Sequence, residues 1–228
     1  MDGGDRSMRI ALLNPNTNQD VTAAMARIAG AAVPSLSIEG HTAPFGADTI
    51  TTPDALAVGA DAVRDMAARL PGDIQGVIVA AYGDPGLDDL RAAWPGPVCG
   101  IGEASFLEAA AHGRSFAVAT TTPDLAEAIA ARVAAAGLTD RFLGVHLTEG
   151  EPLALMRDPD RLLARLAEAV AAAAASGAGA VIIGGGPLAS AAQILRPRLS
   201  VPIIEPLPAA ARLIARLIAD RIADRTAG

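Results

Sequence analysis

The sequence predicts an α/β protein made of two pseudo-symmetric Rossmann-like lobes, each with a parallel sheet, and an active cleft between them. Short apolar runs rich in β-branched residues alternate with longer helical patterns, which is typical of βα units. Two of these runs, at 76–81 and 180–183, break into glycine-containing turns and are each followed by a proline-led strand. This repetition indicates an internal duplication, with a first lobe at 8–112 and a second at 113–228. A single sheet holding both βα units is the alternative, and the terminal helix could cross over to the first lobe.

The first half of the chain predicts four strands, each followed by a helix. Asn14-Pro-Asn-Thr-Asn18 joins the first strand to its helix, and Asn and Thr suit this junction because their side chains cap exposed helix N–H groups. The loop at 41–48 is too long for a simple crossover, and Pro53 then favours the start of the second helix. The expected strands are 9–14, 36–40, 76–81 and 98–101, and the expected helices are 20–30, 55–70, 87–93 and 103–111.

The second half predicts the same alternation. Its first strand ends in three threonines, and Pro123 starts the helix that follows. Residues 184–195, after the glycine run, are expected to be a loop. The expected strands are 115–120, 142–147, 181–183 and 203–204, and the expected helices are 123–136, 158–175 and 209–225.

Composition excludes several classes of partner and cofactor. Aromatic residues make up 3% of the chain and the net charge is -7, so the sequence offers no stacking platform or basic stripe for nucleic acid, and no attraction to an anionic membrane. All 18 basic residues are arginine, which excludes the lysine-bound pyridoxal phosphate of Schiff-base enzymes. A single cysteine, Cys99, and no histidine pair at helical spacing argue against a metal site. We therefore expect neither pyridoxal phosphate nor a structural zinc site, and the polar N-terminus predicts a cytoplasmic protein.

Several segments of the chain carry a family resemblance. They are Leu13-Asn-Pro-Asn-Thr-Asn18, Pro44-Phe-Gly-Ala-Asp-Thr-Ile50, Gly83-Asp-Pro-Gly-Leu87, Pro97-Val-Cys-Gly-Ile-Gly-Glu-Ala104, Ala119-Thr-Thr-Thr122 and Val201-Pro-Ile-Ile-Glu205. This combination resembles the aspartate/glutamate/hydantoin racemases, most of all their hydantoin and allantoin branch. The resemblance implies a cofactor-independent homo-oligomeric enzyme that acts beside a carbonyl of a small carboxylate, hydantoin or cyclic amide.

The resemblance also places two cysteines that this chain lacks. In the family, one thiolate removes a proton from the carbon beside the carbonyl, and a second thiol returns it from the opposite face. These cysteines would fall at Ala81 and Gly185. Cys99 lies in an apolar strand, where a free thiol is usually an inert hydrophobic residue. We therefore expect racemase or isomerase-type chemistry without the two-thiol mechanism; a derived ring-opening hydrolase or decarboxylase, or a non-catalytic small-molecule-binding relative, are the alternatives.

Three side chains could handle a proton or a water molecule in place of the thiols. Tyr82 follows the first lost cysteine, Asp84 lies in the next turn, and Glu205 ends the last strand. Asp84 could instead cap backbone N–H groups in the Asp-Pro-Gly turn, and Tyr82 could be a core residue. The residues expected to bind substrate are Asn14, Thr17, Phe45, Ala81, Gly83, Thr120, Thr121, Gly185 and Gly186.

Overall fold

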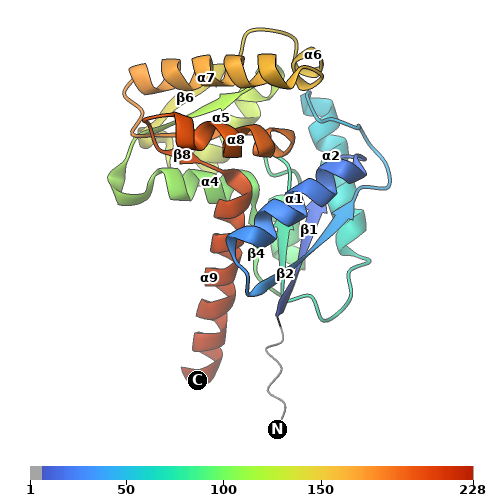
Figure 1. Ribbon diagram of the computed structural model, residues 1–228. Helices are drawn as coiled ribbons and strands as arrows, with labels where there is room; N and C mark the ends of the chain where they lie inside the picture. Colours follow the sequence, from blue (N-terminus) through green and yellow to red (C-terminus); the bar gives the residue numbers. More distant parts are fainter. Residues whose placement is uncertain (1–6, 228) are drawn as a thin grey trace.

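The computed structural model describes residues 7–227 and confirms an α/β architecture with two parallel sheets (Figure 1). The strand order is β2-β1-β3-β4 in one sheet and β6-β5-β7-β8 in the other, so the two sheets are built in the same way. Leu12 lies opposite Ile78 in the first sheet, and Val118 lies opposite Ile182 in the second. The two halves of the chain therefore form two equivalent sheets rather than one.

The elements follow the expected order with small changes at their ends. In the first half they are β1 (Met8–Asn14), α1 (Gln19–Ala32), β2 (Leu36–Thr42), α2 (Pro53–Ala67), β3 (Gly76–Val79), α3 (Leu87–Ala93), β4 (Val98–Gly100) and α4 (Ile101–Ala109). In the second half they are β5 (Phe116–Thr120), α5 (Ala126–Ala135) after a 3₁₀ turn (Pro123–Leu125), β6 (Phe142–Leu147), α6 (Pro152–Met156), α7 (Pro159–Ala175), β7 (Ala180–Ile183), α8 (Ala189–Leu195), β8 (Ile203–Ile204) and α9 (Pro206–Ala227).

Short polar side chains start several of the helices, and the sequence predicts this for the first of them. The Asn18 side chain accepts a hydrogen bond from the Val21 N–H, and Thr52 accepts one from the Ala55 N–H at the start of α2. Asp158 caps α7 in the same way. Each cap satisfies an N–H group that has no partner inside its own helix. These contacts fix where the helices begin and therefore how long the loops are that connect them to the preceding elements.

Two helices were not expected from the sequence. The expectation of a loop over 184–195 is wrong, because α8 forms there and buries Ala189, Ala191, Ala192 and Leu195. The three glycines before it hide the helical pattern, since glycine favours turns. Helix α6 has only five residues and a capping Glu151, so it is too short to show a helical period in the sequence. Helix α4 begins at Ile101, two residues before its expected start.

The last helix of each half packs on the sheet of the other half. Helix α9 packs against α1, β3 and β4, and α4 packs against α5, β7 and β8. Phe106 of α4 stacks on Phe116 of β5, with 6.2 Å between the ring centroids. The hydrophobic core is therefore continuous between the two sheets, and it fixes their strand ends relative to each other. No helix within residues 7–227 combines the length and apolar character needed to cross a membrane.

Candidate active site

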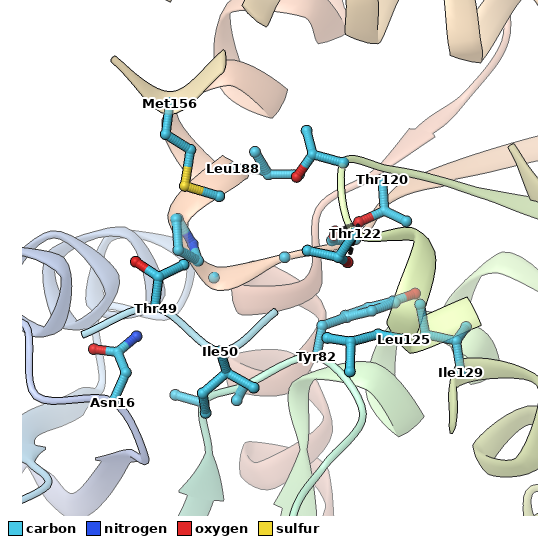
Figure 2. A pocket seen from close by; sticks show the side chains of 17 residues that line it. Asn16, Thr49, Ile50, Tyr82, Thr120, Thr122, Leu125, Ile129, Met156 and Leu188 are labelled. Atoms are coloured by element: carbon cyan, nitrogen blue, oxygen red, sulfur yellow. Dashed lines mark hydrogen bonds between the residues drawn. The ribbon is translucent and has the colours of Figure 1, made fainter. Parts of the chain in front are cut away.

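A pocket lies where the strand ends of the two sheets meet, between the two halves of the chain (Figure 2). Its free volume is about 40 Å³, which is room for a compact small molecule or a few water molecules. The carboxyl ends of parallel strands are the usual ligand crevice of open α/β sheets. The lining residues are Asn16, Thr49, Ile50, Ala80, Ala81, Tyr82, Thr120, Thr121, Thr122, Leu125, Ile129, Met156, Gly184, Gly185, Gly186, Pro187 and Leu188.

The loop after β1 contributes a side-chain amide to the pocket. Asn14 is fully buried, and its Nδ2 donates to Asn16 Oδ1 at 2.7 Å. The Asn18 N–H donates to the same oxygen at 3.0 Å. These bonds occupy the Asn16 oxygen and leave its Nδ2 donors for a ligand, as the amide is oriented by this network. Asn14, expected to bind substrate, thus supports Asn16 from below and does not line the pocket itself.

At the end of β5, the Thr120 hydroxyl makes a hydrogen bond within the described part of the protein and the Thr121 hydroxyl does not. Thr120 Oγ1 donates to the Gly184 carbonyl at 2.8 Å and so ties the ends of β5 and β7 together. Thr121 is almost fully buried, and its Oγ1 has no hydrogen-bond partner within residues 7–227. A buried hydroxyl without a partner is costly. Because Thr121 lines the pocket, a bound polar group is a natural partner for this hydroxyl.

The loops after β3 and β7 bring backbone N–H groups to the pocket. Ala81 and Gly185, where the family resemblance places cysteines, both line it, one from each half of the chain. Within the described chain, the N–H groups of Tyr82, Gly185 and Gly186 donate no hydrogen bond to another residue. Free N–H groups at a strand end can bind a carboxylate or a developing enolate oxygen.

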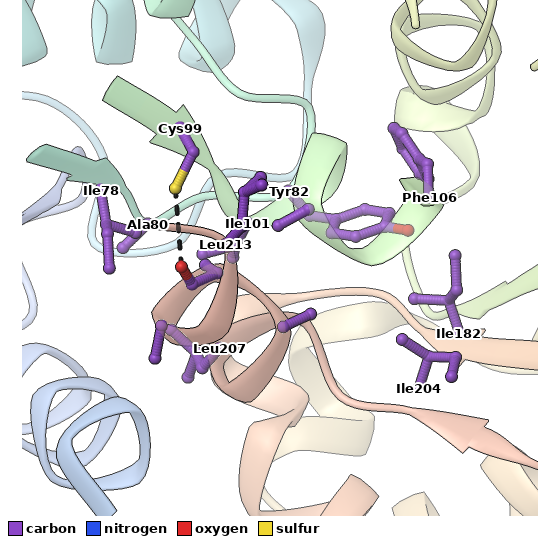
Figure 3. Close-up of a cluster of buried hydrophobic side chains, with 14 of the residues drawn as sticks. Ile78, Ala80, Tyr82, Cys99, Ile101, Phe106, Ile182, Ile204, Leu207 and Leu213 are labelled. Atoms are coloured by element: carbon purple, nitrogen blue, oxygen red, sulfur yellow. Dashed lines mark hydrogen bonds between the residues drawn. The ribbon is translucent and has the colours of Figure 1, made fainter. Parts of the chain in front are cut away.

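Tyr82 forms the floor of the pocket. Its ring lies edge-on to Phe106 with 5.7 Å between centroids (Figure 3), and its hydroxyl lies 3.4 Å from Ser105 Oγ. A Cβ atom at Gly184 would come within 2.5 Å of the ring, so that glycine is required for the ring's position. Burial raises the pKa of Tyr82 far above its ordinary value. Tyr82 is therefore a proton or hydrogen-bond donor rather than a base.

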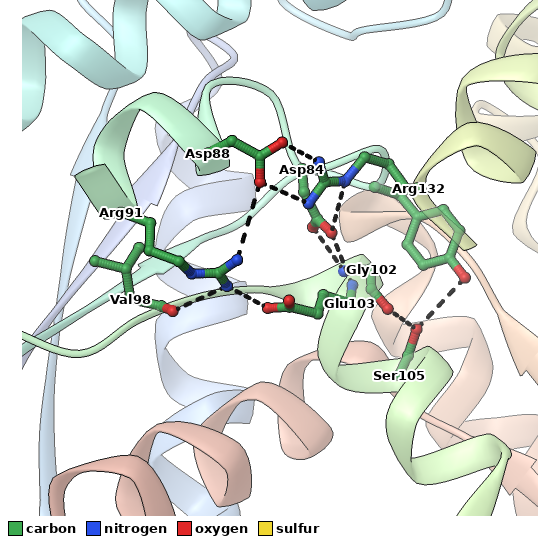
Figure 4. Close-up of polar contacts among 9 residues, drawn as sticks. Asp84, Asp88, Arg91, Val98, Gly102, Glu103, Ser105 and Arg132 are labelled. Carbon is green, nitrogen blue, oxygen red and sulfur yellow. Dashed lines mark hydrogen bonds and ion pairs between the residues drawn. The ribbon is translucent and has the colours of Figure 1, made fainter. Parts of the chain in front are cut away.

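Asp84 lies behind the pocket and not in it. Its carboxylate accepts hydrogen bonds from the Gly102 N–H at 2.8 Å and the Glu103 N–H at 2.7 Å (Figure 4). It thereby caps α4, whose own N-cap residue, Gly100, has no side chain for the purpose. Burial raises the pKa of Asp84 to about 7, although the two N–H donors and Arg132 lower it in part. Asp84, a candidate catalytic residue from the sequence, thus lies outside this pocket, and its carboxylate caps α4.

Glu205 is directed to a different surface. Helix α9 begins at the next residue, so the chain turns away from the strand ends, and Glu205 Oε1 lies 3.2 Å from Arg196 Nε. A separate pocket holds this pair together with Glu108 and Arg212. Burial raises the pKa of Glu205, and the neighbouring arginines oppose the shift. The structure does not bring Glu205 to the candidate site.

The other expected substrate-binding residues divide in two groups. Those that line the pocket are Ala81, Thr120, Thr121, Gly185 and Gly186. Those that do not are Asn14, Thr17, Phe45 and Gly83. The Phe45 side chain is 43% exposed, and the Thr17 N–H donates to the Ala47 carbonyl, which holds the loop before α2 in place. Gly83 lines a neighbouring pocket together with Asp84.

Several lining residues were missed by the sequence reasoning. Asn16 and Thr122 lie inside motifs that the sequence analysis identifies. Each could have been found by asking which polar side chain of the motif is left without a structural role and is therefore available to a ligand. Thr49 and Ile50 are the last two residues of the Pro44–Ile50 segment of the resemblance, and reasoning from that segment could have found them. Met156, Leu125, Ile129 and Leu188 carry no such signal. Met156 comes from α6, a helix that sequence periodicity does not reveal.

The pocket as a whole is neutral. None of its lining side chains is charged, and Tyr82 is the one titratable side chain among them. Cys99 is buried in the core, where its thiol donates to the Ala210 carbonyl at 3.7 Å, and burial raises its pKa. Within residues 7–227 no three His, Cys, Asp or Glu side chains are close enough to hold a metal ion together. The site therefore offers hydrogen-bond donors for an anion but no side chain that is an ordinary base.

The chain is similar to known racemases over nearly its whole length. A family model described as Asp/Glu/hydantoin racemase matches residues 10–214. The hydantoin racemase of Rhizobium meliloti is 31% identical over 216 residues, which cover 90% of this chain and 87% of that protein. The crystal structure of an allantoin racemase from Pseudomonas fluorescens has a TM-score of 0.87 and 29% identity, covering 93% of this chain and 91% of that one. An allantoin racemase from Klebsiella pneumoniae has a TM-score of 0.83 and 28% identity, covering 93% and 88%.

Proposed function

The chain belongs to the Asp/Glu/hydantoin racemase family, and on this basis we propose that its neutral pocket stabilises negative charge beside a carbonyl of a small carboxylate, hydantoin or cyclic amide. The reaction class is that of a racemase or isomerase, run without a cofactor and without a pair of thiols. Family membership supports the class. The composition of the pocket supports the departure from the two-thiol mechanism, because Ala81 and Gly185 stand where the resemblance places the cysteines.

One observation carries the proposal: a single small pocket is lined by residues of the loops after β1, β3, β5 and β7 that carry uncommitted donors. They are the Asn16 amide, the Thr121 hydroxyl and the N–H groups of Tyr82, Gly185 and Gly186. Fixed donors that face a carbonyl oxygen favour its enolate, because hydrogen bonds strengthen as charge develops on the oxygen. Removal of one such donor in an enzyme typically costs about 10²–10³ in rate.

Decarboxylation is a second candidate, and the lack of a base in the pocket favours it. Racemisation begins with loss of a proton from carbon, which needs a base. In a decarboxylation the C–C bond to the carboxylate breaks, CO₂ leaves, and the bonding electrons pass to the enolate. A proton from water or from the Tyr82 hydroxyl then completes the product. Ring-opening hydrolysis has less support, because the carboxylates that would activate water, Asp84 and Glu205, lie outside the pocket.

Proton NMR in D₂O tests the proposal with a panel of hydantoins, allantoin, aspartate, glutamate and substituted malonates. Loss of an α-proton signal without a new compound means isomerisation through the enolate. A new compound one CO₂ lighter, carrying one deuterium, means decarboxylation. Gly184→Ala, which forces the Tyr82 ring out of place, should abolish either signal, whereas Gly72→Ala has open space for its Cβ and serves as the control. If no panel member changes with the wild-type protein, the proposal fails for these substrates.

A further inference from the structure

An arginine of the second half reaches across to the loop that follows β3 (Figure 4). Arg132 lies on α5, and its Nη1 donates to Asp88 Oδ2 at 2.7 Å. Its Nε lies 4.0 Å from Asp84 Oδ2. The Arg132 side chain is only 17% exposed and that of Asp84 is fully buried, whereas Asp88 is 71% exposed. The contact therefore joins the two halves of the chain beside the pocket and away from solvent at its Asp84 end.

The surroundings of Asp84 are built to receive a carboxylate. A Cβ at Gly100 would overlap the carboxyl group, and one at Gly102 would lie 2.8 Å from Oδ2. Two backbone N–H groups bind the carboxylate, and Arg132 is the cation that faces it. The other charged groups nearby are already engaged with each other: Arg91 pairs with Glu103 at 2.6 Å and lies 3.9 Å from Asp88. The buried Arg132 Nε has no hydrogen-bond partner in the described chain, so charge attraction to Asp84 and the bond to Asp88 hold it there.

Arg132 and Asp84 each lie close in sequence to residues that line the pocket. Ile129 lines the pocket one helical turn before Arg132 on α5, and Leu125 lies just ahead of that helix. At the other end, Asp84 follows the floor residue Tyr82 by two positions and caps α4, which carries Ser105 beneath the Tyr82 hydroxyl. A change in the Arg132 contact would therefore alter the distance between the α5 wall and the Tyr82 floor.

We propose that Arg132 is a positioning residue that clamps α5 onto the loop after β3 and so keeps Leu125 and Ile129 against Tyr82. The inference rests on the proposed function only for its effect on ligand binding. A pocket of about 40 Å³ has little room to spare, so a loosened wall changes both the fit of a ligand and the exposure of the floor. A guanidinium suits this role because its planar group contacts two carboxylates at once.

The test uses the fact that Tyr82 is the only tyrosine in the chain. Labelling with tyrosine that carries ¹³C only at its ε carbons shows the ε-CH signal of this one residue in a ¹H–¹³C spectrum, and this signal reports on the pocket floor without any ligand. Arg132→Gln should shift it and lower the affinity for a panel ligand about tenfold or more. Arg64→Gln is the matched control, because Arg64 also pairs with an aspartate of α3, Asp89 at 3.4 Å, but lies on the exposed side of α2. It should leave the Tyr82 signal in place.

An unshifted Tyr82 signal in folded Arg132→Gln overturns the inference, whatever the substrate proves to be. If that variant does not fold, Arg132→Lys decides, because an ammonium group cannot contact Asp84 and Asp88 together as the guanidinium does. A shifted signal in Arg132→Lys supports the clamp, and a wild-type signal contradicts it. Failure of the proposed function alone would leave the Tyr82 shift intact while no panel ligand binds or reacts, so the two failures are distinguishable.

Discussion

The loops after β3 and β7 occupy equivalent places in the two sheets but are held in different ways. Asp84 is the fifth residue after the end of β3 at Val79, and Leu188 is the fifth after the end of β7 at Ile183. Asp84 fixes its loop with a buried carboxylate bound to two N–H groups and faced by Arg132. Leu188 fixes its loop by burial in the apolar cluster around β7. The fold repeats between the halves, whereas the means of holding the loop does not.

This difference separates two tasks within one pocket. The loop after β3 carries the aromatic floor, Tyr82, and its charged anchor resists displacement of that floor. The loop after β7 begins with Gly184, Gly185 and Gly186, which supply space but no side chain, and within residues 7–227 the N–H groups of Gly185 and Gly186 are free. A duplicated fold can thus place an anchored aromatic surface opposite an open, donor-rich one. Substitutions in the two loops should consequently destabilise the protein for different physical reasons.

The largest effect is expected from Asp84→Ala. It leaves the buried Gly102 N–H and the half-buried Glu103 N–H of α4 without an acceptor and Arg132 without its buried partner. It also places alanine at a φ of 49°, which alanine adopts poorly. We expect the free energy of unfolding to fall by about 3 kcal/mol at pH 8. Urea denaturation measures this. Asp89→Ala is the control, because that side chain is 75% exposed on α3, the helix that follows the Asp84 loop, and it should cost less than about 0.5 kcal/mol. Equal costs for the two variants would contradict the assignment of Asp84 as the anchor.

The strands and most of the helices could be predicted from the sequence because their signals are local. Apolar runs, capping residues such as Asn18 and Thr52, and prolines at helix starts all act within a few residues. The role of Asp84 could not be predicted in the same way. It caps a helix that begins 17 residues later, and only the tertiary structure brings the two together. The sequence left both the capping and the catalytic interpretation open, and it offered no sign of Arg132.

The pocket was predictable in outline and less so in detail, for a related reason. Strand ends identify the loops, so Ala81, Thr121 and Gly185 were found. The direction of a side chain at a strand end depends on where the next helix starts. Glu205 is turned away because α9 begins at Pro206, and Asn14 is buried below Asn16. Predicting the direction of such side chains requires the three-dimensional path of the loop.

A smaller loss of stability is expected from Gly184→Ala in the second loop. Its Cβ would meet the Tyr82 ring at 2.5 Å, so the floor or the loop must move. Overpacking of this kind costs about 1–3 kcal/mol, and we expect about 2 kcal/mol together with a shifted Tyr82 signal. Thermal unfolding and the labelled-tyrosine spectrum measure both effects. Gly72→Ala, with no atom near its Cβ, should be neutral; a Gly184→Ala protein as stable as this control would show that the two loops do not press on each other.

The buried Asp84 carboxyl should also make the free energy of unfolding depend on pH. The apolar side chain that holds the second loop, Leu188, has no such effect. An unfolded chain releases the Asp84 proton near pH 4, whereas the folded protein keeps it until about pH 7, because burial raises the pKa. Between these values the unfolded state binds fewer protons, so this group lowers stability as pH rises, by at most about 1.4 kcal/mol per unit. Above pH 7 its contribution is constant. Urea titrations from pH 4.5 to 7.5 should therefore show a steeper fall for the wild type than for Asp84→Asn, and parallel curves would refute the raised pKa.

The smallest effect separates the two positions at which the family resemblance places cysteines. Gly185 has a φ of 148°, which side chains with a Cβ rarely adopt, and its Cβ would lie 3.1 Å from Leu188. Gly185→Cys should therefore cost about 1 kcal/mol. Ala81 already has a Cβ and a backbone that accepts one, so Ala81→Cys should cost less than about 0.5 kcal/mol and place its thiol in the pocket. Thermal unfolding measures the costs, and alkylation rates compare each new thiol with the buried Cys99.

If both cysteines are equally tolerated, the loop after β7 is flexible enough to accept a side chain. The backbone conformation of Gly185 would then not distinguish the glycine loop from the loop anchored by Asp84. If only Ala81→Cys is tolerated, the glycine loop has a backbone conformation of its own, and restoring two thiols would require changes at Leu188 as well.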